Sequence, residues 1–530
     1  MSETNISRRD FMVLMGATSA AVLVPAEFAI AANSKVLVSC LDEDPVTLNT
    51  AISTSIPSLM ASSPVYSALI RVDQQGNLIP DLASSWSSSE DGLTYTFKLR
   101  EGVKWHDGTP FTSGDCKFTI EEMIAPLQPI GKNAFKHLAG VDAPDEHTLV
   151  VRFKQVNQPY LKVPQAHGPI LPKHLWQGTN FTQNPHSKKA IGTGPFKITE
   201  YRIGEEIRYA RYQDYHLKGQ PAFDELVLRI IPDAVSRSAA FENGEIDTVQ
   251  GLSIPFTDIA RLRQLPNVQT VTNPYPGGTY IALFNLREKT LSDQKVRQAI
   301  AFGVDRKFMR ENILPNISRN MVGPLYPASP LHNSQLVDYE FDPARANQLL
   351  DDAGYPRGPD GVRFTVRIAW QNVLIAVTRM ADVMRQNLKD IGIDAQLKPM
   401  ETPALIQNAY IEGDFDILIG SYALGPDPDI GMERLYNSAN IKPLPYTNNS
   451  NYRSDEVDAL FDKQRLTTTF DARKAIYDGI QATIWKDLPT LPLCSYDLVS
   501  FINALRATNC YERIWNPLAE DFGPALPTDA

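Results

Sequence analysis

Residues 91–115 read DGLTYTFKLREGVKWHDGTPFTSGD, and this stretch decides how the rest of the chain is interpreted. Within it, Thr94–Arg100 alternates apolar and polar side chains, which is the pattern of a strand with one buried face. The tetrad Asp107-Gly108-Thr109-Pro110 is typical of a tight turn. His106 beside Asp107 is also the composition of an acid–base pair, but the turn residues that follow favour the turn. The stretch therefore predicts a strand and a structured loop.

Outward from this stretch, the chain alternates strand-like and helix-like segments. Asp342 followed by Pro343 is an N-cap with proline at the first helical position, and Gly354 ends that helix. A longer amphipathic helix is expected from Ile375 to Ile391, and Thr402-Pro403 is expected to open another by the same N-cap device. Further strands are expected at 35–40, 148–154, 225–231, 280–286 and 415–420, and further helices at 293–302 and 471–486. The pattern is that of an α/β protein.

Length and composition limit the class of protein. A chain of 530 residues is too long for one core, so two or three domains are expected. Hydrophobic residues make up 43% and charged residues 21%, which is ordinary for a soluble globular protein. The formal net charge is −10 and there is no basic block, which argues against nucleic acid or an anionic membrane as the main partner.

The N-terminus has the order of an export signal. Arg8 and Arg9 precede an uncharged run of about 14 residues, Phe11–Val24, and the small-residue pattern Ala29-Ile30-Ala31 follows. Two adjacent arginines before the apolar run indicate a twin-arginine signal peptide with cleavage after Ala31. The run is shorter than the roughly 20 residues that a membrane span needs, so an anchor is the weaker interpretation. We expect residues 1–31 to be removed as the Tat translocase exports the protein to the periplasm.

The sequence lacks the common catalytic constellations. There is no Walker A run, no HExxH pair and no GxSxG elbow, and the eight histidines are scattered. Asp427-Pro428-Asp429 is compatible with a metal site, but two carboxylates in a proline-locked loop more often cap a helix. The cysteines Cys40, Cys116, Cys494 and Cys510 form no CxxC pattern; we expect free thiols, with a Cys494–Cys510 disulfide as the open alternative. We therefore expect no catalytic residue, no metal and no cofactor.

Several blocks of sequence carry a family resemblance. Residues 91–115 closely resemble the signature of the peptide- and nickel-type solute-binding proteins of ABC importers, known as family 5. Other blocks are similar in the same order, namely 192–196 (GTGPF), 231–234, 243–247, 284–285, 296–300, 305–306, 353–356, 413–416 and 455–458. Any single block is weak evidence, but together they span essentially the whole chain after residue 31.

The resemblance implies an α/β fold with two lobes, the type II periplasmic binding protein fold of the large class, with an additional domain. The first lobe would comprise residues 32–68, 173–277 and 488–530, the additional domain 69–172, and the second lobe 278–487. The chain would cross between the lobes at Gly277 and Gly278. These two residues are the expected hinge, since glycine absorbs backbone rotation at little cost.

The resemblance also implies which residues line the cleft between the lobes. Trp370 and Tyr422 have flat amphipathic rings suited to stacking, with core packing as the alternative. Peptide-binding members of the family carry an aspartate that pairs with the ligand ammonium, and here that position falls on Leu424 or Gly425, neither of which holds a charge. A free peptide N-terminus is therefore not expected to be bound in the usual way. The expected ligand-binding residues are Ser53, Thr54, Ser55, Tyr280, Trp370, Asn372, Ser421, Tyr422 and Leu424.

The function that the resemblance implies is solute capture. We expect a monomeric extracytoplasmic binding protein that closes around a peptide or peptide-like solute and delivers it to an ABC permease. Three other ligands on the same fold stay open as alternatives: an opine, a sugar conjugate and a nickel chelate. An exported enzyme or chaperone on this scaffold is the alternative of another class.

Overall fold

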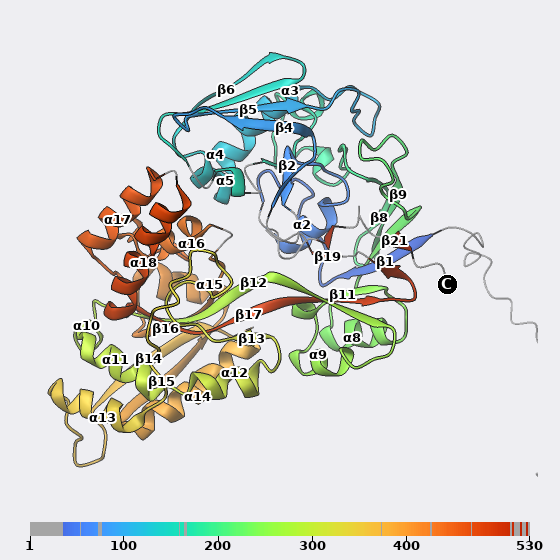
Figure 1. Cartoon of the computed structure of the whole chain (residues 1–530). Coiled ribbons are helices and arrows are strands. Elements are labelled where there is room, and N and C mark those ends of the chain that lie inside the picture. The colour runs from blue at the N-terminus through green and yellow to red at the C-terminus, as the bar shows by residue number, and fades with distance from the viewer. Residues whose placement is uncertain are drawn as a thin grey trace, which may run out of the picture.

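The computed structural model describes most of the chain between residues 35 and 527. Its larger sheets have four, seven and four strands, and Figure 1 shows them in separate parts of the molecule with helices packed around them. The described ranges are 35–53, 55–72, 77–157, 160–163, 167–372, 374–424, 427–467, 469–508, 511–512, 520–521 and 526–527.

The first four-stranded sheet is built from segments far apart in the chain. β1 (Val36–Leu41) pairs in parallel with β10 (Glu225–Ile230), followed by β9 (Glu206–Arg211) and β8 (Phe196–Arg202) in antiparallel order. β1 and β10 coincide with two of the expected strands. Because β10 lies far along the chain from β1, this lobe forms only when distant segments meet.

The second four-stranded sheet contains the first part of the stretch 91–115, in strand β5 (Thr94–Leu99). In β5 the side chains of Tyr95, Phe97 and Leu99 are buried, as the alternation predicts. All adjacent strands of this sheet pair antiparallel. The order of strands in this sheet is β4 (Ala83–Ser88), β5 (Thr94–Leu99), β7 (Thr148–Phe153) and β6 (Leu138–Asp145).

The loop after β5 is fixed to the glycine-rich segment before β8. The chain turns at His106, as predicted; its backbone N–H donates to the Gly192 carbonyl, and its Nε2 lies 2.9 Å from the Gly194 carbonyl oxygen. Both glycines press against the backbone of Val65, and a Cβ at Gly192 would lie 1.9 Å from the Val65 carbonyl oxygen. Two blocks of the family resemblance therefore meet in space and join the additional sheet to the first lobe.

The seven-stranded sheet forms the second lobe and reaches into the first. The expected strand at 280–286 overlaps the end of a much longer strand, β12 (Val268–Phe284). β14 (Phe364–Gln371) and β15 (Ile393–Met400) are parallel and joined through helix α14 (Ile375–Asp390), which covers the sheet. The order is β11 (Thr248–Gln250), β17 (Thr490–Asn503), β12 (Val268–Phe284), β16 (Ile417–Tyr422), β14 (Phe364–Gln371) and β15 (Ile393–Met400), with β13 (Ser318–Arg319) beside β17.

Most helices begin and end close to where the sequence predicts. Asp342 caps α13 (Pro343–Asp352) by accepting a hydrogen bond from the backbone N–H of Arg345 at 2.9 Å. The prediction that Thr402 is an N-cap is wrong, because the chain leaving β15 is still extended at Glu401. Glu401 occupies the N-cap position of α15 (Thr402–Leu405), without a capping hydrogen bond from its side chain. The other helices of eight or more residues are α8 (Ala234–Glu242), α11 (Gln294–Gly303), α12 (Arg306–Ile313), α16 (Pro428–Tyr436), α17 (Asp455–Arg465) and α18 (Phe470–Asp487).

Two further expectations concern the membrane and the cysteines. In the part of the chain that the structure describes, no helix is both long enough and apolar enough to span a membrane. Cys40, Cys116 and Cys494 are buried free thiols, so Cys494 forms no disulfide here; Cys510 lies outside the described residues.

Candidate ligand-binding site between the lobes

Two long strands carry the chain between the lobes. β12 and β17 pair antiparallel along most of their length, and Figure 1 shows them running side by side from one lobe into the other. The register of this pair shifts at three points, one of them between Pro276 and Gly278, where Gly277 lies. Register shifts disrupt the ladder and bend the strand locally. One of the three irregularities of the connection therefore falls at the two glycines expected to be the hinge.

Gly278 lies against two side chains that face the crossing. A Cβ at this position would lie 2.6 Å from the Tyr496 hydroxyl oxygen and 3.1 Å from Oγ of Ser421. Those two oxygens hydrogen-bond to each other at 3.0 Å, and the ring centroids of Tyr280 and Tyr496 are 4.9 Å apart. The structure thus gathers Gly278, Tyr280 and Ser421 around Tyr496. Sequence reasoning missed Tyr496; its only signal was its place in the second crossing segment, opposite Gly278 in the ladder.

Trp370 and Asn372 lie at the end of β14 in different surroundings. Trp370 is buried in the core beneath α14, and its indole N–H donates to the Thr378 hydroxyl at 2.9 Å. These contacts match the alternative interpretation, in which Trp370 packs in the core. Asn372 is half-buried, and its side-chain amide donates a hydrogen bond to the Glu401 carboxylate.

Tyr422 and Leu424 are buried beside α16. Leu424 packs so closely on Gly431 that a Cβ there would lie 2.4 Å from the Leu424 Cα. The ring centroids of Tyr422 and Tyr446 are 5.8 Å apart, and burial raises the pKa of the Tyr422 hydroxyl well above its usual range. Both predicted residues therefore lie in a buried hydrophobic cluster of the second lobe and not on its exposed surface.

The predicted first-lobe residues lie at the start of α2 (Ile56–Ser62). Ser53 and Ser55 are half-buried, and Ser53 Oγ accepts a hydrogen bond from the backbone N–H of Ser55 at 3.2 Å. Ser55 has the extended backbone of an N-cap. The remaining predicted positions lie outside the described residues, namely Thr54, Gly425 and the export-signal residues Arg8, Arg9, Ala29 and Ala31.

A cavity of about 140 Å³ lies between the additional domain and the second lobe. One wall comes from α5 (Pro129–Ala134) and the segment after it, and the other comes from α16 and α17. Arg434 lines the cavity and donates from Nη2 to the Ala423 carbonyl at 3.1 Å, so the cavity adjoins the predicted segment 421–424. The charged and titratable residues of its lining are Lys136, His137, Asp429, Glu433, Arg434 and Arg465.

A buried ion pair holds the loop that opens α16. Asp427 accepts a hydrogen bond from the backbone N–H of Asp429 at 3.1 Å, which confirms the capping interpretation. Its carboxylate also accepts two hydrogen bonds from Arg473, at 2.7 and 2.6 Å. Asp429 accepts one from Gln464. Burial, reinforced by the neighbouring Asp427, raises the pKa of Asp429 to about 6.

This raised pKa predicts a pH dependence of stability. An unfolded aspartate ionises near pH 4, so between about pH 4 and 6 only the folded chain keeps this proton, and the free energy of unfolding falls as pH rises through that window. The full loss is about 3 kcal/mol. Asp429→Asn keeps the acceptor for Gln464 and removes the titrating group. The urea midpoint of this variant should therefore rise relative to that of wild type as pH increases from 4 to 7. A difference between the two proteins that is constant across this range would contradict the assignment.

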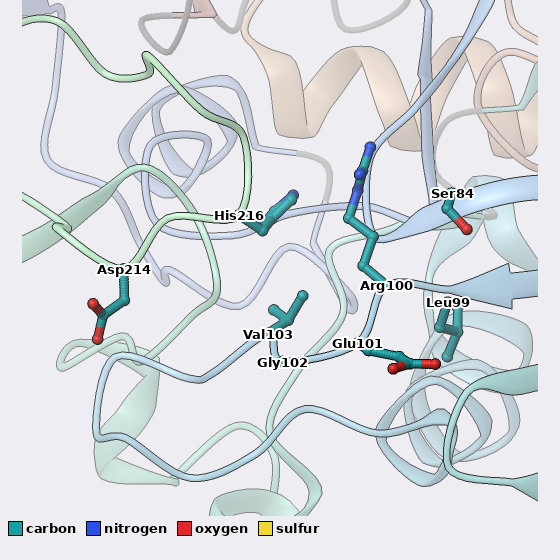
Figure 2. Close-up of a pocket in the computed structure, with 8 residues that line it drawn as sticks. All are labelled: Ser84, Leu99, Arg100, Glu101, Gly102, Val103, Asp214 and His216. Atoms are coloured by element: carbon teal, nitrogen blue, oxygen red, sulfur yellow. The ribbon is translucent and has the colours of Figure 1, made fainter.

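A larger cavity of about 430 Å³ is lined entirely by residues between positions 84 and 216. Figure 2 shows Arg100 and His216 projecting to the same side of it, with Asp214 farther away. His216 is fixed by a 2.8 Å hydrogen bond to the buried carboxylate of Asp81. Burial raises the pKa of Asp81, but Arg71 and His216 outweigh it and hold that pKa at about 2. This cavity has no wall from the second lobe, so it is separate from the inter-lobe site.

Comparison with known proteins identifies the family. Residues 77–443 match the family described as bacterial extracellular solute-binding proteins, family 5, middle region. The chain belongs to this family. As a family 5 solute-binding protein, it is the extracytoplasmic substrate-binding component of an ABC importer.

This family 5 protein is similar to known relatives over most of its length. It is 27% identical over 496 residues to heme-binding protein A of Haemophilus influenzae, covering 88% of each chain. It is 26% identical over 467 residues to the glutathione-binding protein GsiB of Escherichia coli, covering 86% of this chain and 87% of that one. The crystal structure of the ABC transporter substrate-binding protein CtaP of Listeria monocytogenes matches with a TM-score of 0.79 and 28% identity, covering 89% of this chain and 94% of that one. The expected two-lobed α/β fold and solute-binding role are thereby confirmed.

Proposed function

We propose that this protein captures a peptide or peptide-like solute between its lobes and passes it to a membrane permease without changing it chemically. The observation that carries the proposal is the charged cavity walled by the additional domain on one side and the second lobe on the other. A ligand that contacts both walls binds the closed form best, so it shifts the population toward closure. Affinity on the order of micromolar or better, about −8 kcal/mol, is expected for such a buried ligand.

The proposed movement is a rotation of the lobes about the crossing strands. We propose Gly277 and Gly278 as the hinge, with residues 32–68, 173–277 and 488–530 as the first lobe. Residues 69–172 would then be the additional domain and 278–487 the second lobe. The register shifts of β12 against β17 support this position for the hinge, and a single chain supplies both walls of the cavity, which suits a monomer.

The proposed ligand class is peptide-like because GsiB binds glutathione, which is a tripeptide. We propose that the half-buried polar residues Ser53, Ser55, Asn372 and Ser421 contact the ligand directly. Thr54 would do so from the same first-lobe segment. The buried residues Tyr280, Trp370, Tyr422 and Leu424 would support this surface from behind. A nickel complex with an organic chelator stays the alternative ligand on the same fold.

The proposed route to the periplasm is twin-arginine export. Arg8 and Arg9 before the apolar run, with Ala29-Ile30-Ala31 after it, support a signal peptide read by the Tat translocase. Replacing both arginines by lysine should leave the precursor in the cytoplasm, as measured by fractionation and immunoblotting. Undiminished export of that variant would overturn the twin-arginine assignment.

Thermal unfolding with a ligand panel tests the proposed function. The panel contains tri- and tetrapeptides, glutathione, an opine, a sugar conjugate and nickel with free histidine. We expect a peptide-like member at about 100 times its Kd to add about 2.7 kcal/mol to the free energy of unfolding. A shift with the nickel complex alone, or a bound chromophore in the visible spectrum, would contradict the proposal.

A further inference from the structure

Arg434 differs from the other arginines around the inter-lobe cavity because its charge is unpaired. Within the described ranges, no carboxylate lies within ion-pair distance of its guanidinium, and its Nε is buried without a hydrogen-bond partner. Among the described residues, its guanidinium makes one hydrogen bond, from Nη2 to the Ala423 carbonyl at 3.1 Å. A guanidinium has five N–H donors, so this arrangement leaves most of its binding capacity unused at the cavity wall.

The carboxylates of the cavity lining and of the loop that opens α16 already have other partners. Glu433 pairs with Arg465, and Asp427 pairs with Arg473 through two hydrogen bonds. Asp429 accepts a hydrogen bond from Gln464, and the positive charges that act on its carboxylate are those of Arg465 and Arg473. No side chain of the described cavity lining is therefore free to neutralise Arg434.

The environment of Arg434 strengthens its attraction for an anion. Partial burial lowers the pKa of the guanidinium, and Tyr410, Tyr422 and Tyr446 lie close enough to interact with it electrostatically. Lys136 adds a further positive charge from the opposite wall. Electrostatic attraction is larger in such a partly dry site than in bulk water. The guanidinium of this half-buried arginine has no acidic partner among the described residues, so a carboxylate or similar anion could complete its hydrogen bonds.

The cavity has the size of one end of a ligand. Its 140 Å³ equals roughly four or five water volumes, which fits a terminal carboxylate and the atoms next to it. Because Arg434 is anchored to the carbonyl of Ala423, its guanidinium sits beside the predicted ligand-binding segment 421–424. A solute lying along that segment would bring a terminal group into the cavity.

We propose that Arg434 is the specificity-determining residue that binds a ligand carboxylate in the inter-lobe cavity. This inference rests on the proposed capture of a peptide-like solute, and it narrows that class to molecules whose end at α16 is anionic. Charge-assisted hydrogen bonds of this kind change affinity by about 10- to 100-fold.

The test uses trialanine and trialanine carboxamide, which differ only in the C-terminal charge, with Kd measured by calorimetry on the full mature chain. Wild type should bind the free acid about 10- to 100-fold more tightly than the amide. Arg434→Gln should lose this preference, and Arg434→Lys should retain part of it. Without ligand, Arg434→Gln should melt at or above the wild-type temperature, because an unpaired, half-buried charge is removed. If Arg434 were merely structural, the substitution would lower the melting temperature.

Arg465→Gln is the matched control, since Arg465 lines the same cavity but is already paired with Glu433. It should keep the preference for the free acid. Equal wild-type affinity for acid and amide, or an unchanged preference in Arg434→Gln, would overturn the role of Arg434 while leaving peptide capture intact. Failure of both probes and of every peptide-like member of the panel to bind would count against both proposals.

Discussion

Gly192→Ala is expected to lower the melting temperature by about 10 °C or more, or to prevent folding. The added Cβ would lie 1.9 Å from the Val65 carbonyl oxygen and 2.7 Å from its carbonyl carbon. Both are backbone atoms, and the same carbonyl accepts the backbone N–H of Gly194 at 2.7 Å, so the segment has little freedom to move away. Overpacking of this kind costs about 3 kcal/mol or more, and each kcal/mol is worth roughly 2–4 °C in a domain of this size.

Gly140→Ala is the matched control for this prediction. Gly140 lies in β6, and a Cβ there would meet only the end of Arg152 at 3.9 Å. This variant should melt within about 2 °C of wild type. If Gly192→Ala melts as close to wild type as Gly140→Ala does, the close contact between the glycine-rich segment and Val65 does not stabilise the first lobe.

Arg473→Met is expected to destabilise the second lobe by about 3–5 kcal/mol. Asp427 is 3% exposed and Arg473 is 12% exposed in side-chain area, and the pair shares two hydrogen bonds. Methionine keeps the apolar length of the side chain, so the loss arises mainly from the carboxylate that stays buried without its partner. The measurement is urea unfolding followed by tryptophan fluorescence, because Trp370 and Trp485 are buried in the second lobe.

Arg385→Met tests whether that loss comes from burial of the pair. Arg385 and Asp382 lie on α14 with side chains 55% and 53% exposed, and exposed pairs contribute about 0–1 kcal/mol. The double variant Arg473→Met with Asp427→Asn should recover part of the stability, because the unpaired charge is gone. No recovery in the double variant, or equal losses at positions 385 and 473, would contradict the buried-pair explanation.

Local patterns predicted the elements well. The alternation in 94–100 placed Tyr95, Phe97 and Leu99 on the buried face of β5 because the side-chain period of a strand is two. Asp342-Pro343 and Asp427-Pro428 both open helices by capping, which depends only on neighbouring residues. Thr402 failed by one residue, since the sequence does not state where the preceding strand stops being extended.

Contacts between distant segments could not be predicted from such patterns. Tyr496 meets Gly278 and Ser421 only because β12 and β17 pair in one register with several shifts. In the sequence, Arg434 has the appearance of an ordinary polar residue on a helix. Its lack of an acidic partner becomes evident only from the structure, in which Arg465 and Arg473 pair with the neighbouring carboxylates. Trp370 shows the same limit, since an aromatic ring suited to stacking also suits a core.

Native mass spectrometry of the mature protein purified without denaturation tests solute capture most directly. We expect a complex of one chain with one small, carboxylate-bearing, peptide-like molecule that is released when the protein is unfolded. Adding that molecule back to the stripped protein should raise its melting temperature and compact it in small-angle X-ray scattering, as closure of the lobes requires. A stripped protein that neither gains stability nor becomes more compact with its co-purified molecule, or with any member of the panel, would contradict capture between the lobes.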